Sequence, residues 1–314
     1  WVSLGGEDDV VSFNAPGGNA GNTSIWGGTG NDRVTLDNDG TDNDTVQGIV
    51  YTWDVESVQG GAGVDRINAM QSAGVLSIAG GASGDVINAW GTSSTNVVVL
   101  GDSGADTINV DTSNLAGGYG SSNTVYVDGG SDGDLINVGS ASPAYVTVLG
   151  GTGVDTINVR ANDQVSIEGG ADNDVINVTV GGSFANVDAL AGGTVWGDTA
   201  AGGDTASVGG NDEINVRFND VGDVHGGGGN DTITVTSDGD SGAASDSTAV
   251  TSIYGGYGSD VISVGTVDPT NTALRPDAQT RIDAGGDSSN DTINLQYVNS
   301  NIDTIVFGNI VYAA

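Results

Sequence analysis

The stretch VLGGTGVDTINV at residues 148–159 combines a glycine-rich turn, one aspartate and a short alternation of apolar and polar residues. Near copies occur as IWGGTGNDRVTL at 25–36, VQGGAGVDRINA at 58–69, VHGGGGNDTITV at 224–235 and IYGGYGSDVISV at 253–264. The aspartates that end each GGxGxD copy are Asp32, Asp65, Asp85, Asp106, Asp134, Asp155, Asp174, Asp212, Asp231, Asp260 and Asp291. Many neighbouring copies are about 20 residues apart, a period typical of a solenoid.

The alternation on both sides of each turn has a period of two. In VSIEGGADNDVINV (165–178), Val165, Ile167, Ile176 and Val178 alternate with polar residues, which predicts two short strands flanking one turn. Coils closed by a second, variable turn would stack as parallel strands about 4.8 Å apart. We therefore predict an all-β fold: a right-handed parallel β-solenoid of 11–12 coils with about 20 residues each, continuous over residues 1–314.

Unequal spacing between the copies indicates insertions in the solenoid. Loops at one edge do not disturb the core, so a solenoid tolerates them. The insertions are predicted near residues 37–57, 111–124, 179–194, 198–209, 236–250 and 265–280.

The residue after the apolar position that follows each turn is frequently asparagine. By alternation it faces outward, so stacking predicts a ladder of amide hydrogen bonds along one sheet, against the alternative of a merely polar surface position. The asparagines are Asn68, Asn88, Asn109, Asn137, Asn158, Asn177, Asn215 and Asn294.

Composition excludes several classes of partner. The net charge of −35, without any lysine, argues against nucleic acid and against an anionic membrane surface. No apolar run is long enough for membrane insertion. Only four of the 41 acidic residues are glutamate, and the shorter aspartate suits tight turns and metal coordination in loops.

The turn itself favours a hard cation. Glycines adopt positive φ and allow carbonyl groups to point into a tight turn, and the aspartate adds a carboxylate. Stacked turns would enclose a space lined by oxygen atoms, which suits Ca²⁺ far better than zinc or copper. The absence of cysteine and the single histidine, His225, agree with this interpretation.

The repeated GGxGxD motif resembles the hemolysin-type calcium-binding repeat of RTX proteins over nearly the whole chain. The resemblance implies calcium ions between successive coils, here in one column along one edge, and folding that depends on calcium. It implies as ligands the eleven aspartates given above, with Asp102 and Asp172 as added carboxylates where glycine is expected. It also implies that carbonyl oxygens of the turn glycines coordinate the ions. These glycines are Gly27, Gly28, Gly30, Gly60, Gly61, Gly63, Gly150, Gly151, Gly153, Gly226, Gly227, Gly229, Gly255, Gly256 and Gly258. The turns at 196–212 and 284–291 have unusual lengths, which leaves their sites open.

Catalysis is not expected. His225 is predicted to be a surface residue, and one histidine without cysteine cannot complete a nucleophilic triad. Sugar binding through outward aromatic residues is an alternative function. However, Trp26, Trp196 and Tyr254 share one motif position and could instead stack as a column. Ice binding is not favoured, because the polar positions of the turns do not form a regular array.

The sequence therefore predicts an extracellular or cell-surface structural protein. We expect a calcium-rigidified subunit that assembles head-to-tail with copies of itself, through Trp1 and residues Ile302–Ala314, into a filament or surface layer. A cell-surface polysaccharide is a further candidate partner. The alternative is a repeat domain of a larger secreted adhesin, toxin or polysaccharide-active enzyme.

Overall fold

The computed structural model describes residues 2–5, 10–12, 25–28, 32–35, 45–47, 55–71, 74–91, 95–112, 123–139, 144–161, 164–180, 193–198, 209–218, 222–237, 250–266, 279–285, 290–295 and 304–306. These residues form strands and tight turns, and none of them lies in a helix. The chain divides into two compact units, residues 1–156 and 157–314, and each is described by itself.

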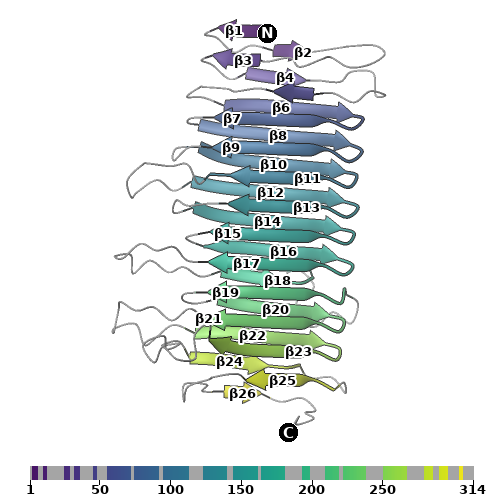
Figure 1. Ribbon diagram of the computed structural model, residues 1–314, viewed down its shortest axis with the longest axis vertical. Coiled ribbons are helices and arrows are strands. Elements are labelled where there is room, and N and C mark those ends of the chain that lie inside the picture. Colours follow the sequence, from purple (N-terminus) through teal and green to yellow (C-terminus); the bar gives the residue numbers. More distant parts are fainter. Residues whose placement is uncertain are drawn as a thin grey trace, which may run out of the picture. The chain divides into compact units, whose positions relative to one another are not determined.

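The first unit has two long parallel sheets and one short sheet (Figure 1). One long sheet has the order β2 (Val10–Ser12), β4 (Asp32–Thr35), β6 (Val55–Ala62), β8 (Gly74–Ala82), β10 (Thr95–Ser103), β12 (Asn123–Ser131), β14 (Ala144–Thr152). The other has the order β5 (Thr45–Gln47), β7 (Arg66–Gln71), β9 (Val86–Gly91), β11 (Thr107–Asp111), β13 (Leu135–Gly139). The short sheet pairs β1 (Val2–Gly5) with β3 (Ile25–Gly28).

The second unit repeats this plan with two parallel sheets. One has the order β16 (Val165–Ala171), β18 (Gly193–Trp196), β20 (Gly222–Gly228), β22 (Val250–Tyr257), β24 (Gln279–Asp283), β26 (Thr304–Val306). The other has the order β17 (Val175–Val180), β19 (Glu213–Phe218), β21 (Thr232–Ser237), β23 (Val261–Thr266), β25 (Thr292–Leu295). Strand β15 (Thr156–Ala161) contains the boundary between the two units.

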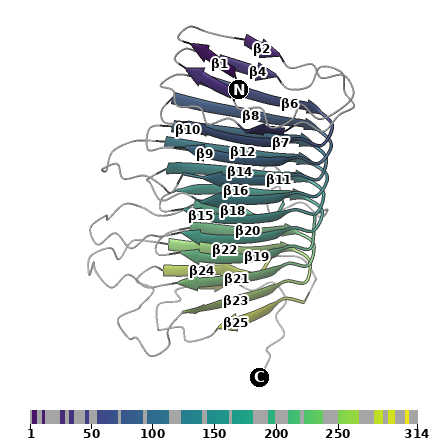
Figure 2. The ribbon, with the colours of Figure 1, turned by 45° about the horizontal axis from the view of Figure 1, so that its top comes forward.

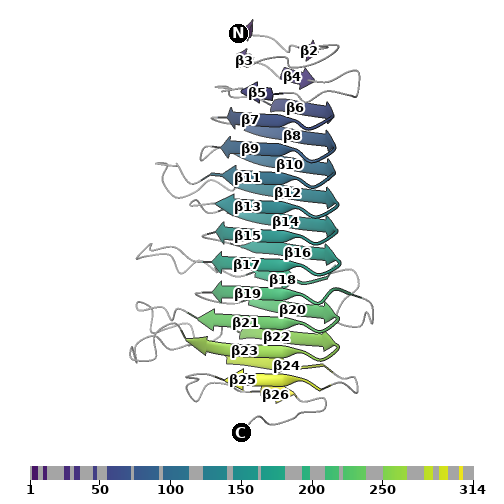
Figure 3. The same cartoon turned by 45° about the vertical axis from the view of Figure 1, so that its right-hand side comes forward.

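Each coil passes from one sheet to the other through the glycine turn. In the first unit, the turns that follow β6, β8, β10, β12 and β14 lie together on one edge, as Figure 2 and Figure 3 show. The register aligns equivalent motif positions: Gly61 pairs with Gly81, and Asn88 pairs with Asn109. The predicted parallel β-solenoid is therefore confirmed in both units, whereas its continuity as one domain stays a prediction.

The inward positions of the strands form the core. In the first unit Ile67, Ile87, Ile108 and Ile136 occupy the same position in four coils, and each is 0% exposed. In the second unit Ile176, Ile214, Ile233 and Ile262 do the same. Full burial of such a side chain contributes roughly 1.5–3 kcal/mol, so every coil adds its own increment of stability.

The predicted asparagine ladder is present in both units. In the first unit, the Nδ2 atoms of Asn88, Asn109 and Asn137 each donate to Oδ1 of the asparagine in the preceding coil, at 2.8–2.9 Å. In the second, Asn177 donates to Asn158 and Asn215 donates to Asn177. The ladder breaks where the sequence changes: Asn294 donates to the hydroxyl of Ser263.

The predicted insertion limits were too wide. The segment 37–57 contains β5 and the first residues of β6, and the other predicted insertions that adjoin strands overlap them by one or more residues. The physical reason is the ladder, because pairing with the neighbouring coil keeps polar residues extended beyond the apolar alternation.

Replacing Ile136 by alanine tests the stacked core. We expect a loss of about 2–5 kcal/mol in the free energy of unfolding, because Ile136 is 0% exposed and its removal leaves a cavity. Leu135 is the matched control, since it points the other way and is 38% exposed. Its replacement by alanine should cost about 1 kcal/mol or less. Urea unfolding followed by circular dichroism in calcium measures both, and equal losses would contradict the assigned faces.

Candidate metal centre

Glycine turns with a recurring backbone conformation connect the two sheets. Positive φ occurs at the second and fourth positions of the GGxGxD motif, for example at Gly151 (φ 117°) and Gly153 (φ 114°). Some copies place another residue in this conformation, at Ser83, Asp102, Asp132 and Asp172. Such residues pay a conformational penalty that glycine avoids, and aspartate tolerates the left-handed region better than most.

The first glycine of the motif is required for a different reason. A Cβ atom built on Gly129 would overlap both Oδ2 of Asp134 in the same turn and the carbonyl oxygen of Gly150 in the next coil. The equivalent Cβ on Gly226 would overlap Oδ2 of Asp231 and the carbonyl oxygen of Gly255. Each turn therefore brings one carboxylate oxygen and one carbonyl oxygen close to the same glycine.

The motif aspartates stack into a ladder in each unit. The first aspartate column is Asp65, Asp85, Asp106, Asp134 and Asp155, and the second is Asp174, Asp212, Asp231, Asp260 and Asp291. Within each column, the backbone N–H of one aspartate donates to Oδ1 of the aspartate in the next coil, at 2.6–3.1 Å. The backbone carbonyl is used too: that of Asp106, for example, accepts from Leu135 N at 2.9 Å.

The second carboxylate oxygen of several of these residues is buried without a hydrogen bond. The column aspartates are at most 3% exposed. Among the described residues, Oδ2 of Asp85, Asp106, Asp134, Asp212 and Asp231 has no hydrogen-bond partner. Buried charged oxygen atoms are costly unless a donor, a proton or a cation compensates them.

The protonation equilibria reflect this cost. Burial raises the pKa of Asp85 from 3.8 to about 6, that of Asp106, Asp134 and Asp212 to about 7, and that of Asp231 to about 8. Desolvation is the main cause, and the neighbouring carboxylates add to it. The ladder hydrogen bond from the preceding aspartate opposes the rise without cancelling it. Without a cation, several of these carboxyl groups would be partly protonated near neutral pH.

The oxygen atoms that the turns bring together fit a hard cation such as calcium. Its donors are carboxylate and backbone carbonyl oxygens, the ligands that Ca²⁺ prefers, and unpartnered oxygens are buried among them. Within the described residues, no three aspartate, glutamate or histidine side chains converge as a metal centre. Carbonyl oxygens of the turns, which lie beside the carboxylates, are the candidates among protein atoms for further ligands.

The predicted ligands fall into three groups. The structure brings ten of the eleven motif aspartates into the two columns, including Asp212 and Asp291, whose turns have unusual lengths. Asp102 and Asp172 are exposed and lie outside the buried columns. The side chain of Asp32 and all of Gly30 lie outside the described residues, while Gly27 and Gly28 end strand β3.

The other predicted glycines lie at the strand ends and in the turns that follow: the first two glycines of each motif lie at the ends of strands β6, β14, β20 and β22, and Gly63, Gly153, Gly229 and Gly258 lie just beyond them. Gly61, Gly63, Gly151, Gly153, Gly227, Gly229, Gly256 and Gly258 have positive φ. Gly60, Gly226 and Gly255 are first-position glycines with a carboxylate and a carbonyl oxygen at the place of their missing Cβ. Gly150 instead contributes the carbonyl that approaches Gly129.

Sequence reasoning missed a second polar ladder, in the turns of the second unit. The fifth motif position carries Asn173, Asn211, Asn230 and Ser259. The backbone N–H of each later member donates to Oδ1 of the preceding one, at 2.6–2.8 Å. Reading that motif position down the repeats would have found it.

His225 is not the surface residue that the sequence predicted. It is 8% exposed, and its ring stacks on Trp196 at 3.7 Å and on Tyr254 at 4.5 Å between centroids. The physical reason is register: Trp196, His225 and Tyr254 pair across adjacent strands, which brings their rings face to face. The predicted aromatic column therefore exists in the second unit, with His225 inside it.

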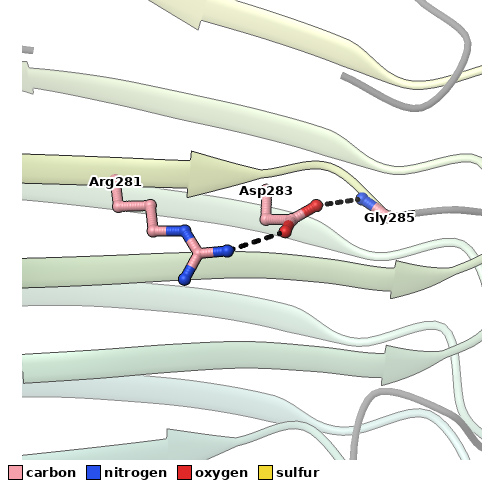
Figure 4. Close-up of polar contacts among 3 residues, drawn as sticks. All are labelled: Arg281, Asp283 and Gly285. Atoms are coloured by element: carbon pink, nitrogen blue, oxygen red, sulfur yellow. Dashed lines mark hydrogen bonds and ion pairs between the residues drawn. The ribbon is translucent and has the colours of Figure 1, made fainter. Parts of the chain in front are cut away.

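A charged pair continues this column. The Arg281 guanidinium lies over the Tyr254 ring at 5.5 Å and contacts Asp283 at 3.3 Å. The other carboxylate oxygen of Asp283 accepts the backbone N–H of Gly285, which opens the next turn (Figure 4). Because the ring faces stack on each other and on Arg281, this column offers a sugar little aromatic face.

Comparisons with protein-family models, with curated proteins and with solved structures find no match for this chain. In the described residues, no helix is long and apolar enough to span a membrane.

The raised carboxyl pKa values predict how stability depends on pH when a chelator removes calcium. A pKa above the unfolded value means that the folded chain binds protons more tightly, so stability increases as the pH falls. We expect the urea midpoint in EDTA to rise from pH 8 to pH 5, through the range of pKa values from about 8 to about 6. Asp106→Asn and Asp231→Asn should reduce this slope, and a midpoint that falls over the same range would contradict the burial of these groups.

Substituting Asp134 by asparagine or by alanine distinguishes the contribution of the ladder hydrogen bond from that of the buried charge. Asparagine keeps an Oδ1 acceptor for the Asp106 N–H and removes a buried charge, so Asp134→Asn should stabilise the chain in EDTA at pH 8. In calcium it should destabilise, because a ligand charge is lost. Alanine should destabilise in both conditions, by about 1–3 kcal/mol in EDTA, because it leaves a buried donor without a partner. Thermal melts measure all four cases, and the absence of a sign change for asparagine would argue against a cation at Asp134.

Proposed function

We propose that this chain is a calcium-binding structural protein of the RTX type, secreted to the cell surface, whose stacked coils are held together by calcium ions. The observation that carries this proposal is the buried aspartate column, in which ladder bonds use one carboxylate oxygen of residues such as Asp106 and Asp134 and leave the other without a donor. The ions would be held by the column aspartates and by carbonyl oxygens of the turn glycines.

Energetics favour calcium over protons as the compensating charge. A chain with a net charge of −35 gains little from further buried carboxylates unless cations neutralise them. Extracellular calcium modules bind with dissociation constants of about 10⁻⁴–10⁻³ M. At millimolar calcium, a site of about 10⁻⁴ M adds roughly 1–3 kcal/mol to folding, and a column adds such increments repeatedly.

A structural role is favoured over a catalytic one. The imidazole of His225 lies between two aromatic rings and is nearly inaccessible. The sequence contains no cysteine or lysine as an alternative nucleophile or base. The repeated ladders account for most of the polar side chains whose contacts the structure describes.

Head-to-tail assembly is part of this proposal and is supported by the last described coil of the second unit. Val264 in β23 is 8% exposed, whereas its register partner Leu295 in β25 occupies the same inward position and is 39% exposed. Among the described strands, β25 pairs with β23 alone. A further coil of the same kind would cover this edge, and a second copy of the chain presents such coils.

Negative-stain electron microscopy and calcium titration test both parts. We expect calcium binding with several ions per chain, and filaments at millimolar calcium that dissolve in EDTA. Leu295→Arg should abolish filaments and leave calcium binding unchanged. Isolated particles at all concentrations would overturn the assembly and favour a repeat domain of a larger secreted adhesin, toxin or polysaccharide-active enzyme. A chain that binds no calcium would overturn the metal assignment.

A further inference from the structure

Asp198 occupies an interrupted turn of the second unit. Between β18 and β19 the chain runs Gly197–Asp198, continues through residues 199–208, and resumes the motif at Gly209. In the next coil the position equivalent to Asp198 is Gly227, with a φ of 107°. Asp198 differs from Asp102, Asp132 and Asp172, which also occupy turn glycine positions, because it is only 6% exposed and lacks a positive φ.

Both oxygens of the Asp198 carboxylate accept backbone hydrogen bonds. Oδ1 accepts the N–H of Gly210 at 3.0 Å, and Oδ2 accepts the N–H of Gly228 at 2.6 Å. Gly210 belongs to the same turn and lies two residues before Asp212. Gly228 belongs to the next coil and lies three residues before Asp231. One side chain therefore holds the turn segments that carry two successive members of the second aspartate column.

The site is shaped for a carboxylate. A Cβ on Gly209 or Gly227 would overlap Oδ2 of Asp198, so both glycines leave room for it. The two donors require two acceptor atoms, which an aspartate supplies and an asparagine does not. Hydrogen bonds to a charged acceptor are roughly twice as strong as neutral ones, so a carboxylate holds the Gly210 and Gly228 amides more strongly than a neutral side chain would.

The column passes through this interrupted turn without a break. Asp174 N donates to Oδ1 of Asp212 at 2.8 Å, and Asp212 N donates to Oδ1 of Asp231 at 2.9 Å. Asp198 is also close enough for its charge to raise the pKa of both Asp212 and Asp231. It does not itself converge with them as a third ligand within the described residues.

We propose that Asp198 is a positioning residue for calcium at Asp212 and Asp231, which orients these ligands by holding Gly210 and Gly228. This inference rests on the proposed calcium-binding function. Residues that orient metal ligands from outside the coordination shell change affinity when they are substituted, by about 10–100-fold in measured cases. Asp198 occupies the position of the second glycine of the regular turns, and its inward carboxylate supplies the two backbone contacts.

Terbium luminescence tests this role on the full chain. Trp196 immediately precedes Gly197, so excitation through tryptophan reports terbium bound near this turn, and the emission that Trp196→Phe removes defines the local signal. Asp198→Asn should shift the half-saturation of that signal to about 10-fold higher terbium or more. Asp223→Asn is the matched control: it removes the same charge from an outward position of β20 and should leave the signal unchanged.

The outcomes separate this inference from the proposed function. If the unsubstituted chain binds neither calcium nor terbium, the proposed function and the positioning role both fail. If it binds normally and Asp198→Asn behaves like Asp223→Asn, the positioning role alone is overturned.

Hydrogen exchange on the unsubstituted chain is a second test, which does not depend on the folding of a variant. The amides of Gly210 and Gly228 should be protected, more strongly with calcium, and exchange at the rate of exposed amides would overturn the role.

Discussion

One hydrogen bond, repeated in each aspartate column, sets the geometry of the turns. The backbone N–H of each motif aspartate donates to Oδ1 of the aspartate one coil further, as between Asp106 and Asp134. A short side chain can receive this bond while its own backbone continues the strand ladder, which explains why aspartate rather than glutamate fills the position. The same approach explains glycine at first motif positions such as Gly129 and Gly226, because Oδ2 and a carbonyl from the next coil lie where a Cβ would be.

The ladder leaves one carboxylate oxygen of Asp85, Asp106, Asp134, Asp212 and Asp231 without a hydrogen bond, and these oxygen atoms connect structure to function. The alternatives for such a buried oxygen are a proton, which the raised pKa values of Asp134 and Asp231 reflect, or a cation. The carbonyl oxygens that face the same space are poor partners for bare carboxylates and good ligands for calcium. With calcium bound as proposed, such a chain would couple its folding to the supply of the ion, because each coil contributes both carboxylates and apolar core.

The two units share this ladder and differ in what they place around it. The fifth motif position is exposed valine at Val64 and Val154 of the first unit, and a hydrogen-bonded asparagine ladder in the second. The second unit also carries the column of Trp196, His225 and Tyr254. Stacking places a recurring residue in a column along the sheet. Outward columns can therefore differ between the units without disturbing the core. At the turn that an insertion interrupts, the second unit instead places Asp198, which accepts two backbone hydrogen bonds.

Much of the fold and of the site follows from the sequence alone. The period of two identifies the inward isoleucines, and the period of about 20 identifies the asparagine ladder and the aligned aspartates, because both depend on local patterns that recur in every coil. Tertiary structure decided the exceptions. Asp102 and Asp172 look equivalent to extra ligands but turn outward with positive φ, whereas Asp198 turns inward to two backbone donors. His225 is buried because its register partners are aromatic. Contacts of this kind join residues up to about 30 positions apart, and their direction depends on how one coil lies on the next, which no single repeat encodes.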